Sequence, residues 1–191
     1  MIFKFKKIMK KYQVFALTIA LFSFIACNQA QKNDMATDQQ DTERTLLSLN
    51  GETLEPVNKS SEAWKQELTD QEYYVLREAG TERAFTSELL NNKEKGIYTC
   101  AGCGLPLFSS ETKFKSGTGW PSFWKPIREE HIIDKKDTSY GMVRTENVCA
   151  RCGGHLGHVF KDGPQPTGLR YCMNGVALDF VKTDQTTLAK K

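Results

Sequence analysis

The sequence has little that could cross a membrane. Its one long apolar run, Val14–Ala26, is interrupted by Thr18 and Ser23 and is shorter than the roughly 20 residues of a membrane-spanning helix. Several lysines precede it: Lys4, Lys6, Lys7, Lys10 and Lys11. A basic segment followed by a short apolar segment is typical of a secretory signal, so we expect residues 1–26 to direct export.

The sequence also lacks an excess of positive charge outside this signal. The full chain carries 26 basic and 23 acidic residues, and the N-terminal lysines account for the whole surplus. The remainder shows no RNA- or DNA-binding motif beyond a zinc-type cysteine spacing, so nucleic acid is not an expected partner. A hydrophobic content of 39% excludes a disordered or fibrous chain and suits one domain with a real core.

Cysteine is scarce, with six in the chain, and the first directly follows the signal. The segment from Phe24 to Cys27, FIAC, resembles the lipobox of bacterial lipoproteins, although Phe24 replaces the usual aliphatic residue. The resemblance implies a lipid on Cys27, a polar tether over residues 27–58, and an exported lipoprotein anchored to a membrane of a bacterial cell envelope. A plain signal peptide or an uncleaved anchor would share the same apolar run.

Four further cysteines form two Cys-x-x-Cys pairs, which are Cys100 with Cys103 and Cys149 with Cys152. Two such pairs can supply the four thiolates of a tetrahedral structural zinc site. Two disulfides are an alternative in an exported protein, and a mixed site could use the histidines of HLGH. The spacing favours one zinc ion held by the four cysteines.

The last cysteine, Cys172, lies outside both pairs. It follows His155 and His158 in the chain and is flanked by Arg170 and Asn174. Such neighbours can stabilise a thiolate and protonate a leaving oxygen, which makes Cys172 a candidate nucleophile. The alternative is a buried structural thiol.

A loop rich in glycine and proline, SGTGWPSFW over residues 116–124, carries Trp120, Phe123 and Trp124. Aromatic side chains beside proline usually pack in the core. An exposed indole near a thiolate would instead form an apolar wall for a small methyl or thioether group.

The remaining pattern predicts a mainly β domain with N-terminal helices. SSEAWKQEL begins with serines that can cap one helix, and Thr69 begins a second with a capping box to Glu72. Gly80 suits a left-handed cap at the end of the second helix. From Gly96 onward, glycines separate short runs such as GIYTC, PLFSS, GMVRT, GHVF and VALDFV, which is typical of antiparallel strands.

Together these segments resemble the B-type peptide-methionine sulfoxide reductases, which reduce the R epimer of methionine sulfoxide. The resemblance extends over about residues 60–182 and rests on GTERAF, the two cysteine pairs, FKSGTGWPSFW, GMVRTE, HLGHVF-x-DGP and PTGLRYC-x-N. It implies a catalytic domain over residues 59–183 and a polar tail over residues 184–191. The implied fold is two small antiparallel sheets with N-terminal helices packed on them, stapled by zinc at the two cysteine knuckles.

The resemblance also implies roles for individual residues. The implied catalytic residues are Cys172, His155, His158, Arg170 and Asn174, the substrate-binding residues are Trp120 and Phe123, and the zinc ligands are Cys100, Cys103, Cys149 and Cys152. The implied partners are oxidised methionine residues in proteins or peptides and an external thiol reductant, for example of thioredoxin type. Thiolate attack on the sulfoxide would leave the catalytic cysteine as a sulfenic acid.

Thr118 departs from the pattern of many family members, which carry an internal resolving cysteine at this place in the SG-C-GWPSF loop. With one cysteine assigned to the lipid, four to zinc and one to catalysis, no internal disulfide partner remains unless Cys27 or a zinc ligand serves. We therefore expect an external thiol to reduce the Cys172 sulfenic acid directly.

Two other functional classes fit part of the sequence. A membrane-tethered, zinc-ribbon-like binding module would explain the paired cysteines but would leave Cys172, HLGH and Trp120 without a role. Another thiol oxidoreductase, such as a peroxide-reducing enzyme, would use Cys172 and would turn over peroxide in place of sulfoxide.

Overall fold

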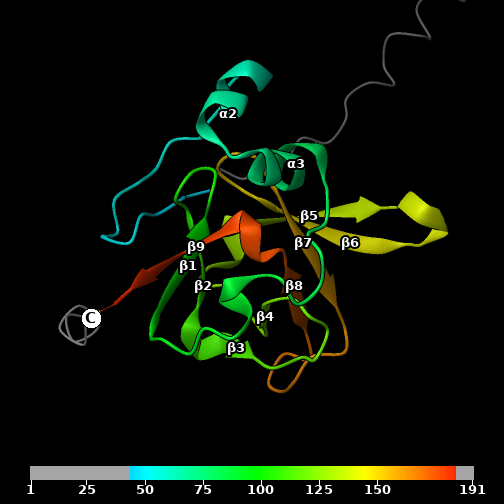
Figure 1. Cartoon of the computed structure of the whole chain (residues 1–191). Coiled ribbons are helices and arrows are strands. Elements are labelled where there is room, and N and C mark those ends of the chain that lie inside the picture. Colours follow the sequence, from blue (N-terminus) through cyan, green and yellow to red (C-terminus); the bar gives the residue numbers. More distant parts are fainter. Residues whose placement is uncertain (1–43, 184–191) are drawn as a thin grey trace, which may run out of the picture. The chain divides into compact units, whose positions relative to one another are not determined.

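The computed structural model describes residues 44–183 (Figure 1). The expected signal sequence, the lipid site at Cys27, the first part of the tether and the C-terminal tail lie outside the described residues. No helix within the described range combines the length and apolar character needed to cross a membrane.

Both helices begin where a polar side chain can cap them. The first, α2 (Ser61–Glu67), starts after Ser60, whose hydroxyl accepts a backbone N–H of the first turn. The second, α3 (Asp70–Glu78), starts with a capping box in which the side chains of Thr69 and Glu72 each bond the other's backbone N–H. The two predicted helix starts are confirmed.

The end of α3 differs from the prediction. Ala79, and not Gly80, adopts the left-handed conformation, with φ of 54°. Gly80 is required for space instead, because an added Cβ would lie 2.3 Å from the Tyr74 ring. Gly80 also takes part in the cap, because its N–H donates to the Tyr74 carbonyl at 3.0 Å.

The strands form two antiparallel sheets, as predicted. The smaller sheet has the order β2-β1-β9 and the larger has the order β3-β4-β8-β7-β6-β5. The strands are β1 (Gly96–Cys100), β2 (Pro106–Ser109), β3 (Lys113–Phe114), β4 (Ser122–Phe123), β5 (Ile132–Asp137), β6 (Arg144–Cys149), β7 (His155–Phe160), β8 (Arg170–Met173) and β9 (Leu178–Lys182). One short 3-10 helix precedes the strands, η1 (Glu88–Leu90), and four lie between them: η2 (Ser110–Thr112), η3 (Glu129–His131), η4 (Ser139–Gly141) and η5 (Gly175–Ala177).

Aromatic side chains fill the space between the sheets. Phe108 of β2 stacks on Phe123 of β4 with ring centroids 4.4 Å apart, and Tyr98 of β1 meets Phe123 edge-on at 4.9 Å. All three side chains are fully buried, and burial of one side chain of this size stabilises a fold by about 1.5–3 kcal/mol. Phe123 therefore helps to join the two sheets.

The helices cover the two cysteine knuckles. Trp64 of α2 and Leu76 of α3 are buried, and Leu76 packs so closely on Gly154 that an added Cβ there would lie 3.0 Å from it. Arg77 stacks on the Trp64 ring and donates from Nη1 to the Cys152 carbonyl at 2.9 Å. The N-terminal helices thus pack on the sheets at the knuckle end.

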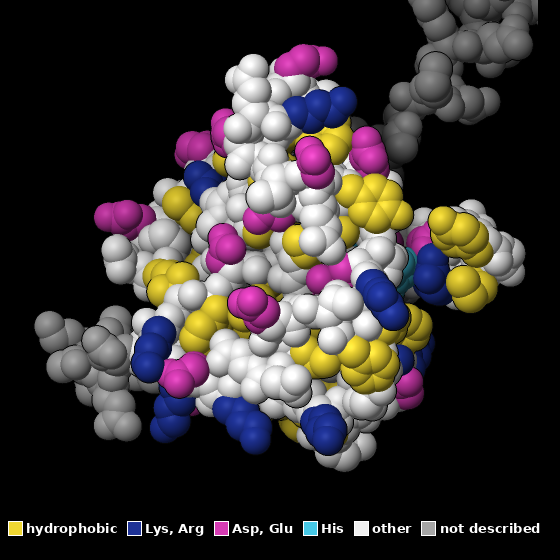
Figure 2. All heavy atoms as spheres, viewed as in Figure 1, with side chains coloured by type: hydrophobic (Ala, Val, Ile, Leu, Met, Phe, Trp, Pro, Cys, Tyr) yellow, Lys and Arg dark blue, Asp and Glu magenta, His cyan; other side chains and the backbone are white. Residues whose placement is uncertain are grey.

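The β5–β6 hairpin extends outward from the larger sheet (Figure 1). At its free end Tyr140 is 90% exposed and Val143 is 77% exposed, and Figure 2 shows apolar side chains gathered there. The base of the hairpin remains in the sheet, next to β7.

Candidate active site

The four paired cysteines lie together in one cluster. Their sulfur atoms are all within 4.8 Å of one another, with Cys100 and Cys152 3.7 Å apart and Cys103 and Cys149 3.5 Å apart. A disulfide needs about 2.05 Å, whereas four sulfurs about 2.3 Å from one zinc lie about 3.8 Å apart in a tetrahedron. The cluster fits one structural zinc ion and not two disulfides.

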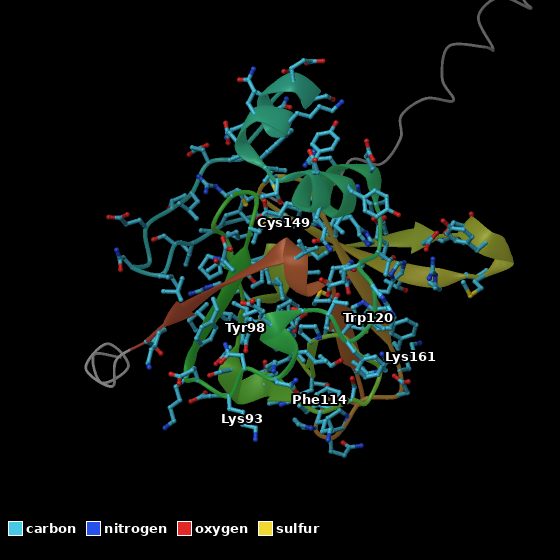
Figure 3. The ribbon with its side chains drawn as sticks, viewed as in Figure 1. Lys93, Tyr98, Phe114, Trp120, Cys149 and Lys161 are labelled. Atoms are coloured by element: carbon cyan, nitrogen blue, oxygen red, sulfur yellow. The ribbon has the colours of Figure 1, made fainter. Side chains whose placement is uncertain are left out.

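The histidines of HLGH are not part of this cluster. Both have carboxylate partners on the larger sheet, Glu146 for His155 and Asp137 for His158. In Figure 3, Cys149 lies beneath α3, and Trp120 lies away from Cys149. The knuckles therefore act as a staple at one end, separate from the site described next.

Cys172 lies in the larger sheet between β4 and β7. Its Cα is paired with that of Ser122 on one side and that of His158 on the other. Paired residues of antiparallel strands project to the same face, so all three side chains share the face opposite the core. Gly157 permits this close packing, since an added Cβ would lie 2.1 Å from the Cys172 carbonyl oxygen.

A bulge in β7 brings both histidines to the face of Cys172. Residues three apart in a regular strand point to opposite faces. The β6–β7 register changes, however, so that Asn147 is opposite Gly157 while Val148 is opposite His155. One extra residue in β7 returns His155 to the face of His158, and their ring centroids lie 5.5 Å apart.

Each of these histidines is backed by a carboxylate. Nδ1 of His155 lies 2.6 Å from Glu146, and Nε2 of His158 lies 2.8 Å from Asp137. Burial lowers the pKa of His155, and the hydrogen bond that His155 donates to Glu146 acts in the opposite direction. Hydrogen bonds from Ser139, and then from His158, hold the pKa of Asp137 well below its usual range, so that carboxylate stays ionised.

Arg170 is held beside the sulfur by contacts of its own. Its guanidinium donates to both carboxylate oxygens of Asp162, at 2.9 and 2.8 Å, and stacks on Phe160 at 4.3 Å. The bond to Asp162 raises the pKa of Arg170, and the nearby Cys172 adds to the effect. The structure thus brings Arg170 to Cys172 as a fixed positive charge.

The side chain of Asn174 forms hydrogen bonds with two backbone groups. Its side chain is buried: Oδ1 accepts the Glu82 backbone N–H at 3.0 Å and Nδ2 donates to the Leu156 carbonyl at 3.2 Å. The family resemblance implies that Asn174 is one of the catalytic residues. In the structure its side chain positions the turn after Cys172.

Glu82 connects this turn to Trp120. Its buried carboxylate accepts the N–H groups of Gly175 and Val176, and its carbonyl accepts the Trp120 indole N–H at 3.2 Å. A carboxylate that accepts two backbone N–H groups is a strong anchor. The indole is thus fixed relative to the strand that carries Cys172.

Comparison with known proteins identifies the family of this chain. The peptide methionine sulfoxide reductase MsrB of Leptospira interrogans is 59% identical over 66% of this chain and 96% of its own length. The MsrB proteins of Methanosarcina barkeri and Agrobacterium fabrum are 61% and 55% identical, over 68% and 67% of this chain and 90% and 95% of their own lengths. The SelR domain model matches residues 68–182. The chain belongs to the SelR family of B-type peptide-methionine sulfoxide reductases.

In this SelR-family chain the two expected substrate residues have different surroundings. Trp120 lines a cleft of about 230 Å³ together with Phe85 and Phe114. Phe85 is 69% exposed and adopts a left-handed φ of 67°, which is uncommon for a bulky residue. Phe123 has no exposed surface, so it supports the loop from within the core and cannot contact a substrate directly.

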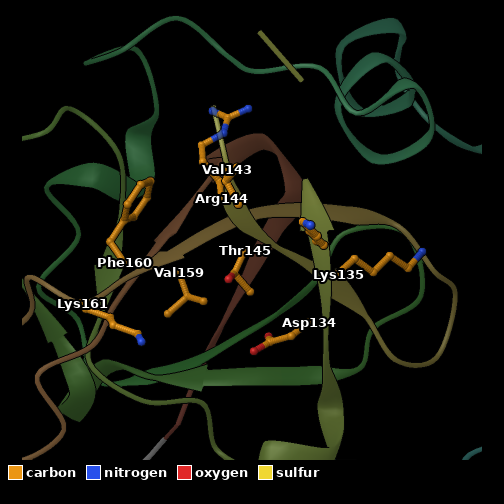
Figure 4. A pocket seen from close by; sticks show the side chains of 9 residues that line it. Asp134, Lys135, Val143, Arg144, Thr145, Val159, Phe160 and Lys161 are labelled. Atoms are coloured by element: carbon orange, nitrogen blue, oxygen red, sulfur yellow. The ribbon is translucent and has the colours of Figure 1, made fainter. Parts of the chain in front are cut away.

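A second hollow is lined by residues of β5, β6 and β7 and the segments next to them (Figure 4). Val159 and Thr145 form part of its lining, and these residues alternate with His158 and Glu146 along their strands. None of the predicted site residues lines it.

Sequence reasoning did not single out the carboxylates of this site. Glu146 lies inside GMVRTE, but the motif does not indicate which residue Glu146 contacts. Asp137 lies in a charged stretch of the kind usually found on the solvent-exposed surface. Glu82 lies in GTERAF. The place of Glu146 and Glu82 inside family motifs was a signal that both matter. Their partners, however, follow only from the tertiary structure.

Proposed function

We propose that this chain reduces the R epimer of methionine sulfoxide in oxidised proteins and peptides, with Cys172 as the nucleophile. Membership of the SelR family and the name shared by its relatives support the reaction. The observation that supports the nucleophile is the position of Cys172, outside the zinc cluster and paired with His158 across the sheet.

The first step transfers oxygen between two sulfur atoms. The Cys172 thiolate attacks the sulfoxide sulfur while a protonated histidine donates its proton to the sulfoxide oxygen. The S–O bond of the sulfoxide and the transient bond between the two sulfurs then break, and the oxygen passes with that proton to the cysteine sulfur as the methionine thioether leaves. The methionine sulfur is reduced to the thioether, and Cys172 is oxidised to the sulfenic acid. His155 and His158 are the donors, since each is oriented by its own carboxylate.

Trp120 would receive the methyl group of the substrate. Its indole is partly exposed and fixed through Glu82, and it borders the cleft with Phe85 and Phe114. Packing a methyl group against an indole favours sulfoxides that carry the small S-methyl group of methionine.

The second step requires an external thiol. Thr118 lies 3.7 Å from the Cys172 sulfur, and the four other cysteines in the described range form the zinc cluster. A thiol attacks the sulfenic acid and releases water to form a mixed disulfide, and a second thiol then restores Cys172. The reductant must therefore reach the open face of β8.

We also propose that the chain acts as an exported lipoprotein, with a signal over residues 1–26, a lipid on Cys27 and a tether over residues 27–58. The basic segment, the apolar run and the small residue before Cys27 support this. Metabolic labelling with an alkyne fatty acid tests it. Wild-type chain should incorporate the label and Cys27→Ala should not. Equal labelling of both would contradict the proposal.

Incubation with separated R and S sulfoxides of a methionyl peptide, with dithiothreitol as reductant, tests the reaction. The R form should be reduced and the S form left unchanged. Cys172→Ser should abolish turnover while zinc content and melting temperature remain at wild-type values. Retained turnover by Cys172→Ser would overturn the assignment of the nucleophile.

A further inference from the structure

Three hydroxyl groups form a continuous line that ends at the Cys172 sulfur. Ser122 Oγ lies 2.7 Å from Ser116 Oγ, and Ser116 Oγ lies 2.8 Å from Thr118 Oγ1. Thr118 Oγ1 lies 3.7 Å from Cys172 Sγ. Each separation is within hydrogen-bond distance for its pair of atoms.

The surrounding contacts give this line a direction. Ser116 Oγ accepts from the Ser122 hydroxyl and, at 3.4 Å, from the Thr118 backbone N–H, so its own proton is free to point toward Thr118 Oγ1. Thr118 then donates toward the sulfur. The Ser122 hydroxyl also donates to the Trp120 carbonyl at 3.1 Å, so its one proton is shared between that carbonyl and Ser116 Oγ. The carbonyl can only accept a hydrogen bond, so it does not donate back to Ser122.

The backbone fixes the line relative to the sulfur. Ser122 is almost fully buried and is paired with Cys172 across β4 and β8. On either side of Thr118, Gly117 and Gly119 adopt left-handed φ values of 78° and 94°, a region that favours glycine. This backbone turns the Thr118 hydroxyl back toward the strand that carries the cysteine.

We propose that Thr118 and Ser116, anchored by Ser122, form a hydroxyl relay that donates to the Cys172 thiolate and holds negative charge on the sulfur. The inference rests on the proposed function in taking Cys172 as the nucleophile, and it adds Thr118 as a catalytic residue and Ser116 as a positioning residue. Hydrogen bonds to an anion are stronger than neutral ones, and each hydroxyl polarises the next in a chain.

The test is the pH dependence of Cys172 alkylation by iodoacetamide in the zinc-loaded full chain, followed at that cysteine by mass spectrometry. Thr118→Val, which keeps the shape and removes the hydroxyl, should move the midpoint of the profile upward by about one pH unit. Thr118→Ser should leave it near the wild-type value. Ser116→Ala should move it upward by about a few tenths of a unit.

The double variant separates a relay from independent packing effects. With Thr118 replaced by valine, the line is cut at its last link, so adding Ser116→Ala should move the midpoint no further. Thr167→Val, which removes a loop hydroxyl bonded to the Trp124 carbonyl, is the matched control and should not move it.

An unchanged midpoint in Thr118→Val overturns the relay, and so does a Ser116→Ala shift that is equal in both backgrounds. If Thr118→Val fails to retain zinc or its melting temperature, Ser116→Ala alone decides, and an unchanged midpoint overturns the proposal. Because alkylation needs no sulfoxide, this result is independent of whether the chain reduces methionine sulfoxide.

Discussion

The carboxylate of Glu146 lies 2.6 Å from Nδ1 of His155, although the two residues are paired with different neighbours across the sheet. Glu146 is directly opposite His158, and it reaches His155 because the β7 bulge displaces that residue. One carboxylate and one bulge therefore set the orientation of the buried histidine.

Glu146→Gln should shift the pH dependence of turnover toward acid. Glu146 raises the pKa of His155 against the lowering effect of burial, so its neutralisation lowers that pKa further. If protonated His155 is the donor, activity is present below its pKa and is lost as pH rises through it. The alkaline limb of kcat should move down by about one pH unit, as measured by peptide sulfoxide reduction. An unmoved limb would exclude His155 as the acid.

Asp137→Asn should lower kcat by up to about 100-fold and leave KM little changed. Asp137 orients His158 and pairs with Arg144 at 2.6 Å, so its loss misaligns a donor without removing binding surface. Asp134→Asn is the matched control, because its carboxylate accepts from Asn147 instead. A loss of similar size in Asp134→Asn would point to damage to the hairpin as a whole.

Trp120→Ala should reduce kcat/KM for a peptide sulfoxide by more than about fivefold. Burying one methyl group contributes about 1 kcal/mol, and the loop also loses the bond to Glu82. Trp124→Ala is the control, since Trp124 stacks with Lys125 and does not line the cleft. Equal effects of both substitutions would make Trp120 a packing residue only.

Cys103→Ser should abolish stable folding before it affects the chemistry. Small zinc sites contribute roughly 10–16 kcal/mol of apparent binding energy, which is comparable with the whole stability of a domain. Metal analysis should give one zinc ion in the wild type and none in this variant, with a large fall in melting temperature. Wild-type chain with no zinc and two disulfides would contradict the site.

Thr118→Cys should convert the recycling step to an internal disulfide. The Thr118 hydroxyl is already 3.7 Å from the Cys172 sulfur, so a thiol there needs only a small shift to form a bond of about 2.05 Å. After one turnover, dimedone should label Cys172 in most wild-type molecules and in few molecules of the variant. A wild-type disulfide from Cys172 to Cys27 or to a zinc ligand would rule out the external route.

The sequence by itself determined the parts of this protein that depend on residue type and short spacing. The Cys-x-x-Cys pairs predicted a four-sulfur site, because two sulfurs on one tight turn are a local property. The capping box at Thr69 predicted the start of α3 for the same reason. The leftover Cys172 in RYC-x-N gave the candidate nucleophile, and the motifs in combination gave the family.

Only the tertiary structure decided how these parts meet. HLGH places two histidines at a spacing that would put them on opposite faces of a regular strand, and the β6–β7 register change reverses this. Phe123 lies in a segment that the sequence presents as a loop. It is in the core, because β4 pairs with β8 in the larger sheet and the Phe123 ring packs on Phe108 of the smaller sheet. The carboxylates behind the histidines and the hydroxyl line to Cys172 join segments far apart in the chain, and such contacts follow from sheet register, which local sequence does not encode.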